Sequence, residues 1–363
     1  MFRSALALAV VAGIALTVHA AEMPPAQEGA AGVAAKHAMD RGIEADPAVV
    51  FYDGFEEENW KQKWYKQNVR WRLRDVERVT GRETAFTGTG SCRLSLKPGK
   101  LYGSSLGSGK LKPGWDVMHL RWYVRFSENY TGGKHGTTSA LDERTWVPGA
   151  SGKRPTGTDK ANSMVCLGKD GLPGMYYYNL DQRGRWGSGG KQNVGAPAKL
   201  ENGKWHCLEI ASAMNTPGQK DGWQRLWVNG KLKGEWKSVR WRTAESLKWN
   251  SWCFLIGSND KAPGEQYLLL DNVVVATEYI GLMVKEAPKP AASQTEGASP
   301  KQMLSHEDLE SAAAEKQAGR LYQMAQRAER MGQKSVARKL YEQILEKHPD
   351  TEIAKKAKAK LGG

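Results

Sequence analysis

A lysine and a histidine stand together in a glycine-rich stretch of the chain. The stretch reads Thr131-Gly132-Gly133-Lys134-His135-Gly136 and follows a run that alternates like a β-strand. Its glycines allow a ligand to approach the backbone closely, and Lys134 and His135 offer an amine and an imidazole that can hold an anion or exchange protons. The alternative interpretation is a solvated hairpin loop in which neither side chain does chemistry.

Two further segments place polar side chains at the spacing of one strand face. Tyr176 and Tyr178 are two residues apart, so in a strand they share a face. The same alternation puts Ser163 and Val165 together in the segment Asn162-Ser163-Met164-Val165-Cys166. Two phenols on an open face could contact a sugar or transfer protons, whereas ordinary packing in a β-rich domain is the alternative.

The sequence lacks the signatures of phosphate-binding and zinc enzymes. It contains no Walker-type glycine loop and no His-Glu-x-x-His motif, and its seven histidines do not cluster. We therefore expect no cofactor and no catalytic metal. Asp53 and Asp271 are candidate ligands of a structural calcium ion, with turn formation and capping as their alternative role. Glu209 and Glu278 could meet in space as the carboxylate pair that a glycosidase needs, but the Lys, Arg, Tyr and Trp of the middle strands favour a different chemistry.

The chain is strongly basic, and most of its charge belongs to one region. It has 53 Lys and Arg against 39 Asp and Glu, a formal net charge of +14. Residues 47–282 hold 35 basic and 23 acidic residues, which gives +12 for that region. A basic domain of this kind favours an anionic partner.

The first twenty residues have the features of a secretory signal peptide. Arg3 precedes an apolar run from Ala5 to Val18, and Val18-His19-Ala20 fits a small-x-small cleavage pattern. No later stretch approaches the ~20 apolar residues of a spanning helix. We expect a secreted or periplasmic protein without a membrane span after signal cleavage. In those compartments acidic polysaccharide is a more common polyanion than nucleic acid, so we expect it as the partner, and no nucleic acid.

An oxidising compartment also affects the interpretation of the cysteines. One or two disulfides are plausible there, and the alternative is that all four are small buried residues on strands. The four are Cys92, Cys166, Cys207 and Cys253.

The elements expected to position these side chains are β-strands. Residues 47–282 contain short runs with period-2 alternation separated by turn residues, and Asn229-Gly230 favours a type I′ hairpin. This pattern predicts a mostly β fold, an antiparallel β-sandwich of the jelly-roll type, with a barrel as the alternative. Residues 21–46, rich in small residues and without periodicity, predict a flexible leader.

Helical periodicity follows a Pro-rich linker at residues 283–300. Residues 301–363 predict a short α-helical segment with helices from Ser305 to about Ala328, over about 335–347 and over about 351–361. The part from 325 to 349 resembles a tetratricopeptide repeat, although a single repeat buries little surface alone. We expect this tail to bind a protein partner, and a solvated stalk is the alternative.

Several short pieces, in order, resemble the alginate-lyase-type polysaccharide lyases of family fourteen, which are concanavalin-like jelly rolls. They are Gly132-Gly133-Lys134, the Tyr176 and Tyr178 pair, Gly203-Lys204-Trp205, Met214 to Gly218 with Asp221-Gly222, Leu226 to Gly230, and Asp271-Asn272-Val273. The resemblance implies a face that cleaves uronic-acid polymers by β-elimination without a redox cofactor.

The same resemblance implies roles for individual residues. Lys134 matches the active-site lysine, Tyr176 and Tyr178 the paired tyrosines, and Ser163 a substrate-binding serine, while Val165 stands where the family has an arginine. Because the reaction builds negative charge beside a carboxylate, that arginine needs a replacement. The candidate substrate-binding replacements are Arg121, Arg125 and His135.

The leading hypothesis is therefore a secreted polysaccharide lyase acting on an acidic polysaccharide. A non-catalytic carbohydrate-binding module for acidic glycans is the second. An envelope scaffold protein with a helical interaction tail is the third.

Overall fold

The computed structural model describes residues 23–65, 73–145, 152–285, 334–362 and a few helical residues between 315 and 329. The predicted signal peptide, most of the predicted linker and the predicted helix start at Ser305 lie outside the described residues. The chain divides into two compact units, residues 1–289 and 290–363.

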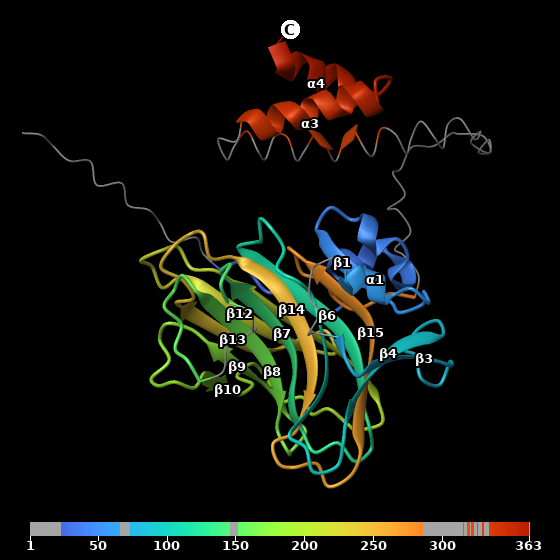
Figure 1. The fold of residues 1–363 in the computed structure, drawn as a ribbon, viewed down its shortest axis with the longest axis vertical. Coiled ribbons are helices and arrows are strands. Elements are labelled where there is room, and N and C mark those ends of the chain that lie inside the picture. Colours follow the sequence, from blue (N-terminus) through green and yellow to red (C-terminus); the bar gives the residue numbers. More distant parts are fainter. Residues whose placement is uncertain are drawn as a thin grey trace, which may run out of the picture. The chain divides into compact units, whose positions relative to one another are not determined.

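The first unit is a sandwich of two antiparallel sheets (Figure 1). Sheet A has the order β13 (Lys231–Val239), β12 (Gly222–Val228), β11 (Trp205–Ala213), β6 (Val117–Phe126), β15 (Gln266–Ala276), β4 (Gly90–Leu96) and β3 (Val76–Thr80), and β1 (Val49–Asp53) also pairs with β15. Sheet B has the order β10 (Ser188–Gly190), β9 (Pro173–Tyr178), β8 (Lys160–Leu167), β7 (Gly133–Leu141), β14 (Trp249–Gly257), β5 (Tyr102–Gly107) and β2 (Leu73–Arg74). The predicted antiparallel β-sandwich is confirmed, and the barrel alternative is wrong.

The core lies between the sheets and is built from alternate residues of each strand. On β6, Trp122, Val124 and Phe126 belong to this core, so the residues between them point to the outer face of sheet A. On sheet B, Val165 of β8 and Met175 of β9 pack against the same core. Strands β6, β8 and β9 therefore direct one face into the core, and their alternate residues lie on the outer faces of the sheets.

The N-terminal segment is folded against sheet A, which corrects the predicted flexible leader at residues 21–46. Its short 3-10 helices are η1 (Val33–Lys36), η2 (Ala38–Asp40) and η3 (Ile43–Ala45). Val33 and Ile43 are buried with Val274 and Ile280 in a small apolar cluster. A run of small residues without hydrophobic periodicity suggests a flexible segment. Here the side chains are small enough for the segment to pack closely against sheet A. The expectation failed because 3-10 turns leave no 3.6-residue pattern.

Backbone and buried-ion contacts fasten this segment in place. The carbonyl of Gln27 accepts a hydrogen bond from Trp227 Nε1 at 2.8 Å, and Val33 N donates to the Tyr279 carbonyl at 2.9 Å. Asp40 forms an ion pair with Arg121, and both side chains are fully buried. The segment is thus a third layer over part of sheet A.

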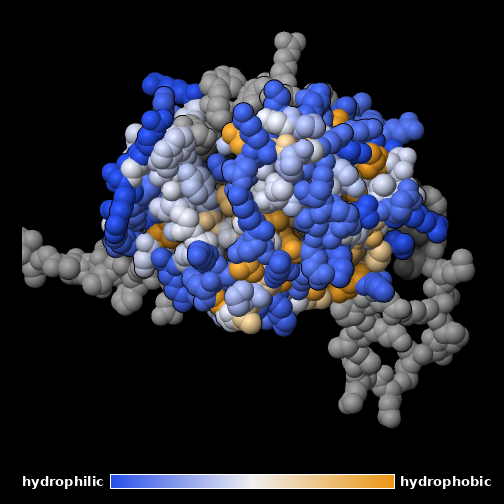
Figure 2. Space-filling model, turned by 90° about the horizontal axis from the view of Figure 1, so that it is seen from below, coloured by the Kyte–Doolittle hydropathy of each residue, from blue (hydrophilic) through white to orange (hydrophobic). Residues whose placement is uncertain are grey.

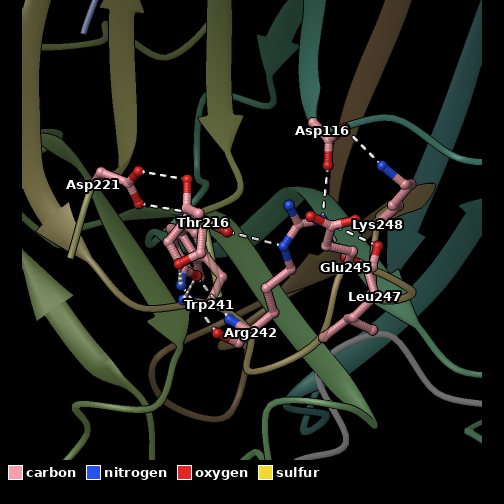
Figure 3. A network of polar contacts seen from close by, with 9 residues as sticks. Asp116, Thr216, Asp221, Trp241, Arg242, Glu245, Leu247 and Lys248 are labelled. Atoms are coloured by element: carbon pink, nitrogen blue, oxygen red, sulfur yellow. Dashed lines mark hydrogen bonds and ion pairs between the residues drawn. The ribbon is translucent and has the colours of Figure 1, made fainter. Parts of the chain in front are cut away.

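A polar network joins the loops at one end of the sandwich (Figure 3). Arg242 donates from Nε to the Asn215 carbonyl at 2.9 Å and from Nη1 to Asp116 Oδ1 at 2.7 Å. Asn215 Oδ1 in turn accepts the backbone N–H groups of Trp241 and Arg242. Because the Arg242 guanidinium bonds a backbone carbonyl and a carboxylate, while the Asn215 side chain accepts two backbone N–H groups, the network holds the loop after β11 against the loop after β13.

The second unit contains the helices α3 (Lys334–Lys347) and α4 (Glu352–Gly362). They confirm the helices expected at about 335–347 and 351–361. Tyr341 and Ile344 of α3 are buried together with Ala354 and Ala357 of α4. Thr351 Oγ1 accepts a hydrogen bond from Ala354 N at 3.1 Å, which caps α4. The tetratricopeptide likeness and the protein partner of this tail stay predictions.

Two further expectations concern disulfides and membranes. No disulfide joins the four cysteines, so the expected one or two disulfides are wrong. The alternative of small buried residues on strands is confirmed for Cys92, Cys207 and Cys253, whereas Cys166 is only partly buried. The four cysteines lie on four different strands, and none of them lies opposite another cysteine on a neighbouring strand. The register of the sheets therefore keeps the thiols apart. Among the described residues no helix has the length and apolar content to cross a membrane.

Candidate functional site

Lys134, Tyr176 and Tyr178 come together on the outer face of sheet B. The hydroxyl oxygens of Tyr176 and Tyr178 are 3.4 Å apart, and the Lys134 Nζ lies 5.2 Å from the centroid of the Tyr176 ring. Tyr177, between the two tyrosines, packs against the core, which places its neighbours on the opposite face. Three residues from two separate segments therefore form one cluster.

Strand register explains why these side chains meet. Met164 of β8 lies opposite Tyr176 of β9, and Cys166 of β8 lies opposite Lys134 of β7. Met164 and Cys166 are two residues apart in one strand, so all four side chains lie on the same face of sheet B. Strand β7 enters the sheet at Gly133, which has a φ of 146°. A Cβ there would lie 2.1 Å from the Gly257 carbonyl oxygen, so only glycine permits this close approach and hence the position of Lys134.

The two phenol groups are held by backbone donors as well as by each other. Gly187 N donates to the Tyr176 oxygen at 2.8 Å, and Gly152 N donates to the Tyr178 oxygen at 3.2 Å. The pair has two hydroxyl protons, and the hydrogen bond between the phenols uses one of them, so the pair has one proton left to donate. Tyr178 is buried and Tyr176 is partly buried. Burial, and after it the hydrogen bond with Tyr178, raises the pKa of Tyr176 well above its ordinary value.

Lys134 is a cation without an ion-pair partner among the described residues. Its Nζ approaches two aromatic rings instead, those of Tyr176 and of Tyr102 at 5.9 Å. The neighbouring Cys166 stays a thiol, because burial raises its pKa to about 11 even though Lys134 acts in the other direction. An ammonium group held between ring faces, with no carboxylate beside it, is available for an anionic ligand.

Sequence reasoning missed a row of polar side chains beside the tyrosines. Asn162 lies opposite Tyr178 on one side and opposite Ser139 on the other, so the three share the outer face of sheet B. Asn162 Nδ2 donates to Ser139 Oγ at 3.2 Å, but Asn162 Oδ1 and Thr137 Oγ1 are buried and have no hydrogen-bond partner among the residues that the structure describes. Buried polar atoms are normally paired, so these two are positioned for partners that a ligand or water would supply.

Ser163 and Val165 do not belong to this site. Ser163 is fully buried between the sheets, where its Oγ donates to Gln224 Oε1 at 2.9 Å. Val165 packs in the core. The predicted pairing of these two was correct, but their shared face is the inner one, and Asn162 and Met164 stand on the tyrosine face instead. Val165 therefore lies on the inner face of β8, whereas the arginine that the resemblance implies at this position would have to lie on the face of the tyrosines.

His135 is also directed into the core and is not a substrate-binding group in this structure. It is fully buried against the rings of Trp122 and Phe126. Burial lowers its pKa to about 3, and neither ring nitrogen has a hydrogen-bond partner among the described residues. Strand alternation decides the matter, because Lys134 faces outward and the next residue must face inward.

Arg121 and Arg125 lie on the outer face of the other sheet. Burial alone would lower the pKa of Arg121, but its ion pair with Asp40 raises it above the ordinary value. Arg125 lies over the Trp205 ring at 5.4 Å. Because β6 belongs to sheet A, neither arginine can replace a cation beside Lys134.

Asp53 and Asp271 both accept hydrogen bonds from N–H groups. Asp53 accepts from Phe55 N and from Trp64 Nε1, and Asp271 accepts from the backbone N–H groups of residues 86, 87 and 272. These contacts match the capping role that was the alternative to calcium binding. Within the described ranges, no three His, Cys, Asp or Glu side chains gather in a group that could hold a metal ion.

One serine has the spacing of a hydrolase nucleophile but not the geometry. Ser105 is the central residue of Gly103-Ser104-Ser105-Leu106-Gly107, which fits a Gly-x-Ser-x-Gly pattern. The whole stretch lies within strand β5. A nucleophile elbow needs a sharp turn from a strand into a helix, so this match has no catalytic meaning.

Solved structures of polysaccharide lyases are similar to this chain at low identity. The alginate lyase vAL-1 from Chlorella virus is 19% identical, with 63% of this chain and 99% of that chain covered and a TM-score of 0.49. The PL-14 alginate lyase from Aplysia kurodai is 18% identical, covering 56% and 91%, with a TM-score of 0.47. The endo-beta-1,4-glucuronan lyase from the fungus Trichoderma reesei is 16% identical, covering 63% and 95%, with a TM-score of 0.42.

No protein-family model matches the sequence, and no curated protein matches it either. Similarities of this size carry no inference about activity, which has to come from the geometry of the cluster.

Proposed function

We propose that this protein is a polysaccharide lyase that cleaves an acidic, uronic-acid-containing polysaccharide by β-elimination. The observation that carries the proposal is the cluster on sheet B: a lysine with no ion-pair partner in the described part of the chain lies 5.2 Å from the ring of one of two hydrogen-bonded tyrosines. A net charge of +14 favours a polyanionic substrate. The signal-like first twenty residues support export to a compartment where such polymers occur.

The reaction needs three things that this cluster can supply. The C5 proton of the uronate must be removed, the C4–O4 bond must break as a C4=C5 double bond forms, and the leaving O4 must gain a proton. Negative charge accumulates on the C6 carboxylate as the C5 proton leaves, so a fixed cation beside it lowers the barrier. Lys134 takes this role as counter-ion.

The tyrosine pair carries the proton. With one of its two hydroxyl protons removed, the pair accepts the C5 proton and then holds two protons again, of which one passes to O4. The N–H groups of Gly152 and Gly187 point at the two oxygens and stabilise the deprotonated pair. Protons and electrons balance within this scheme, and no redox cofactor takes part.

Ultraviolet absorbance of the unsaturated uronate product tests the proposal. The wild-type protein and Lys134→Met are incubated with alginate, glucuronan and other uronate polymers, and with a neutral glucan as control. We expect product from at least one uronate polymer, none from the glucan, and a loss of about 10²-fold or more with Lys134→Met. Binding of a uronate polymer by the wild type without any product would instead identify a non-catalytic module.

A further inference from the structure

Exposed aromatic side chains are few in the described part of the chain, and two of them border the cluster on sheet B. Trp186 is 56% exposed and Tyr102 is 55% exposed, whereas most other aromatic rings are buried or partly buried. On the face seen in Figure 2, hydrophilic residues predominate and hydrophobic ones reach the surface in small patches. What distinguishes these two rings is their place beside the cluster, where an aromatic ring with an open face can pack against a ligand.

Trp186 lies in the loop between β9 and β10, directly beside the tyrosine pair. The next residue is Gly187, whose N–H donates to the Tyr176 oxygen. A Cβ on Gly152, whose N–H donates to Tyr178, would come within 3.4 Å of Trp186 and 3.0 Å of Arg185. The Arg185 guanidinium lies 4.9 Å from the Trp186 ring centroid. The loop therefore presents a ring and a cation at the tyrosine end of the cluster.

Tyr102 occupies the lysine end of the cluster. It belongs to β5, and its ring lies 5.9 Å from Lys134 Nζ. A Cβ on Gly257, which pairs with Tyr102, would approach Tyr102 Cδ1 to 3.3 Å. The glycine thus leaves the Tyr102 ring room to lie against the sheet, with most of its surface open to solvent.

We propose that the cluster is flanked by two subsites that bind sugar rings of an acidic polysaccharide on either side of the reacting unit. Trp186 and Arg185 form one subsite, and Tyr102 forms the other. The inference rests on the proposed function and deepens it. A pyranose ring presents C–H groups that pack on an aromatic face, and Arg185 supplies charge for the carboxylate of a bound uronate unit, while Lys134 stays with the reacting unit. A chain that spans both rings must extend beyond the cleaved linkage in both directions, so the site takes a polymer interior and not only a chain end.

Binding and cleavage measured on the same variants test this. The variants are Trp186→Ala and Tyr102→Ala, with Phe86→Ala as the matched control, because Phe86 is another exposed aromatic residue, 37% exposed, whose ring stacks on Tyr123 of sheet A. Affinity is measured with uronate oligosaccharides of increasing length by calorimetry, together with KM and kcat on the polymer. Thermal unfolding is followed to show that each variant is folded.

We expect Trp186→Ala and Tyr102→Ala each to weaken binding of long oligosaccharides about tenfold, which corresponds to ~1.4 kcal/mol. Disaccharide binding and kcat should change little, and Phe86→Ala should match the wild type. If both variants weaken binding in this way but the wild type forms no product, the subsites are supported and the proposed lyase activity is overturned. Wild-type cleavage with unchanged KM and affinity in both variants overturns the subsites alone.

Discussion

The hydroxyl oxygens of Tyr176 and Tyr178 lie 3.4 Å apart, and each also accepts one backbone N–H. The two phenols thus form a single proton-carrying unit that neither residue would make alone. The arrangement depends on strand β9, which places residues two apart on one face, and on two loop glycines that come close enough to donate.

Removing one hydroxyl should disable this unit. We predict that Tyr178→Phe lowers kcat on a uronate polymer by about 10²-fold or more, because the remaining tyrosine has no partner with which to exchange the proton. Tyr176→Phe should have a similar effect, measured by initial rates of product absorbance. Tyr177→Phe is the control, since its ring is directed to the core from the same strand. Loss of activity in the control as large as in the other two would contradict a role for the pair.

Activity should rise with pH on the alkaline side of neutrality. Burial raises the pKa of Tyr176 above its ordinary value, so at neutral pH the pair is fully protonated in most molecules. The deprotonated pair is the form that removes the C5 proton, and its population grows tenfold for each pH unit below that pKa. A profile of kcat/KM against pH, with circular dichroism to mark the range in which the protein stays folded, measures this. An acidic optimum would exclude a tyrosine as the base.

The buried ion pair of the N-terminal segment should be important for stability. We predict that Asp40→Asn lowers the free energy of unfolding by about 3–5 kcal/mol, because it leaves the Arg121 guanidinium buried without a counter-charge. Urea titration followed by tryptophan fluorescence measures the change. The double variant Asp40→Leu with Arg121→Met should recover a large part of the loss, since it removes both charges.

Glu143→Gln is the control for that experiment, because Glu143 pairs with Lys112 on the surface. It should leave the urea midpoint unchanged. An equal midpoint for Asp40→Asn and the wild type would show that the N-terminal segment is not held by its ion pair.

Local patterns in the sequence were sufficient for the strands of the sandwich and for the two C-terminal helices, but not for the 3-10 helices of the N-terminal segment. Period-2 alternation over residues 47–282 predicts the strands, and the 3.6-residue period predicts α3 and α4, because both patterns are set by neighbours along the chain. The same alternation correctly paired Tyr176 with Tyr178 and Ser163 with Val165. The resemblance brought Lys134 together with the tyrosines, and the structure places these three within one cluster.

Only the tertiary structure decided which face of each strand is open and which sheet each strand joins. Ser163 and Val165 share the inner face of β8, while Asn162 and Met164 share the face of the tyrosines. Arg121 and Arg125 share a face too, but β6 belongs to the opposite sheet. Alternation is a property of one strand, whereas sheet membership and register come from pairing with strands far away in the chain, and no local pattern records them.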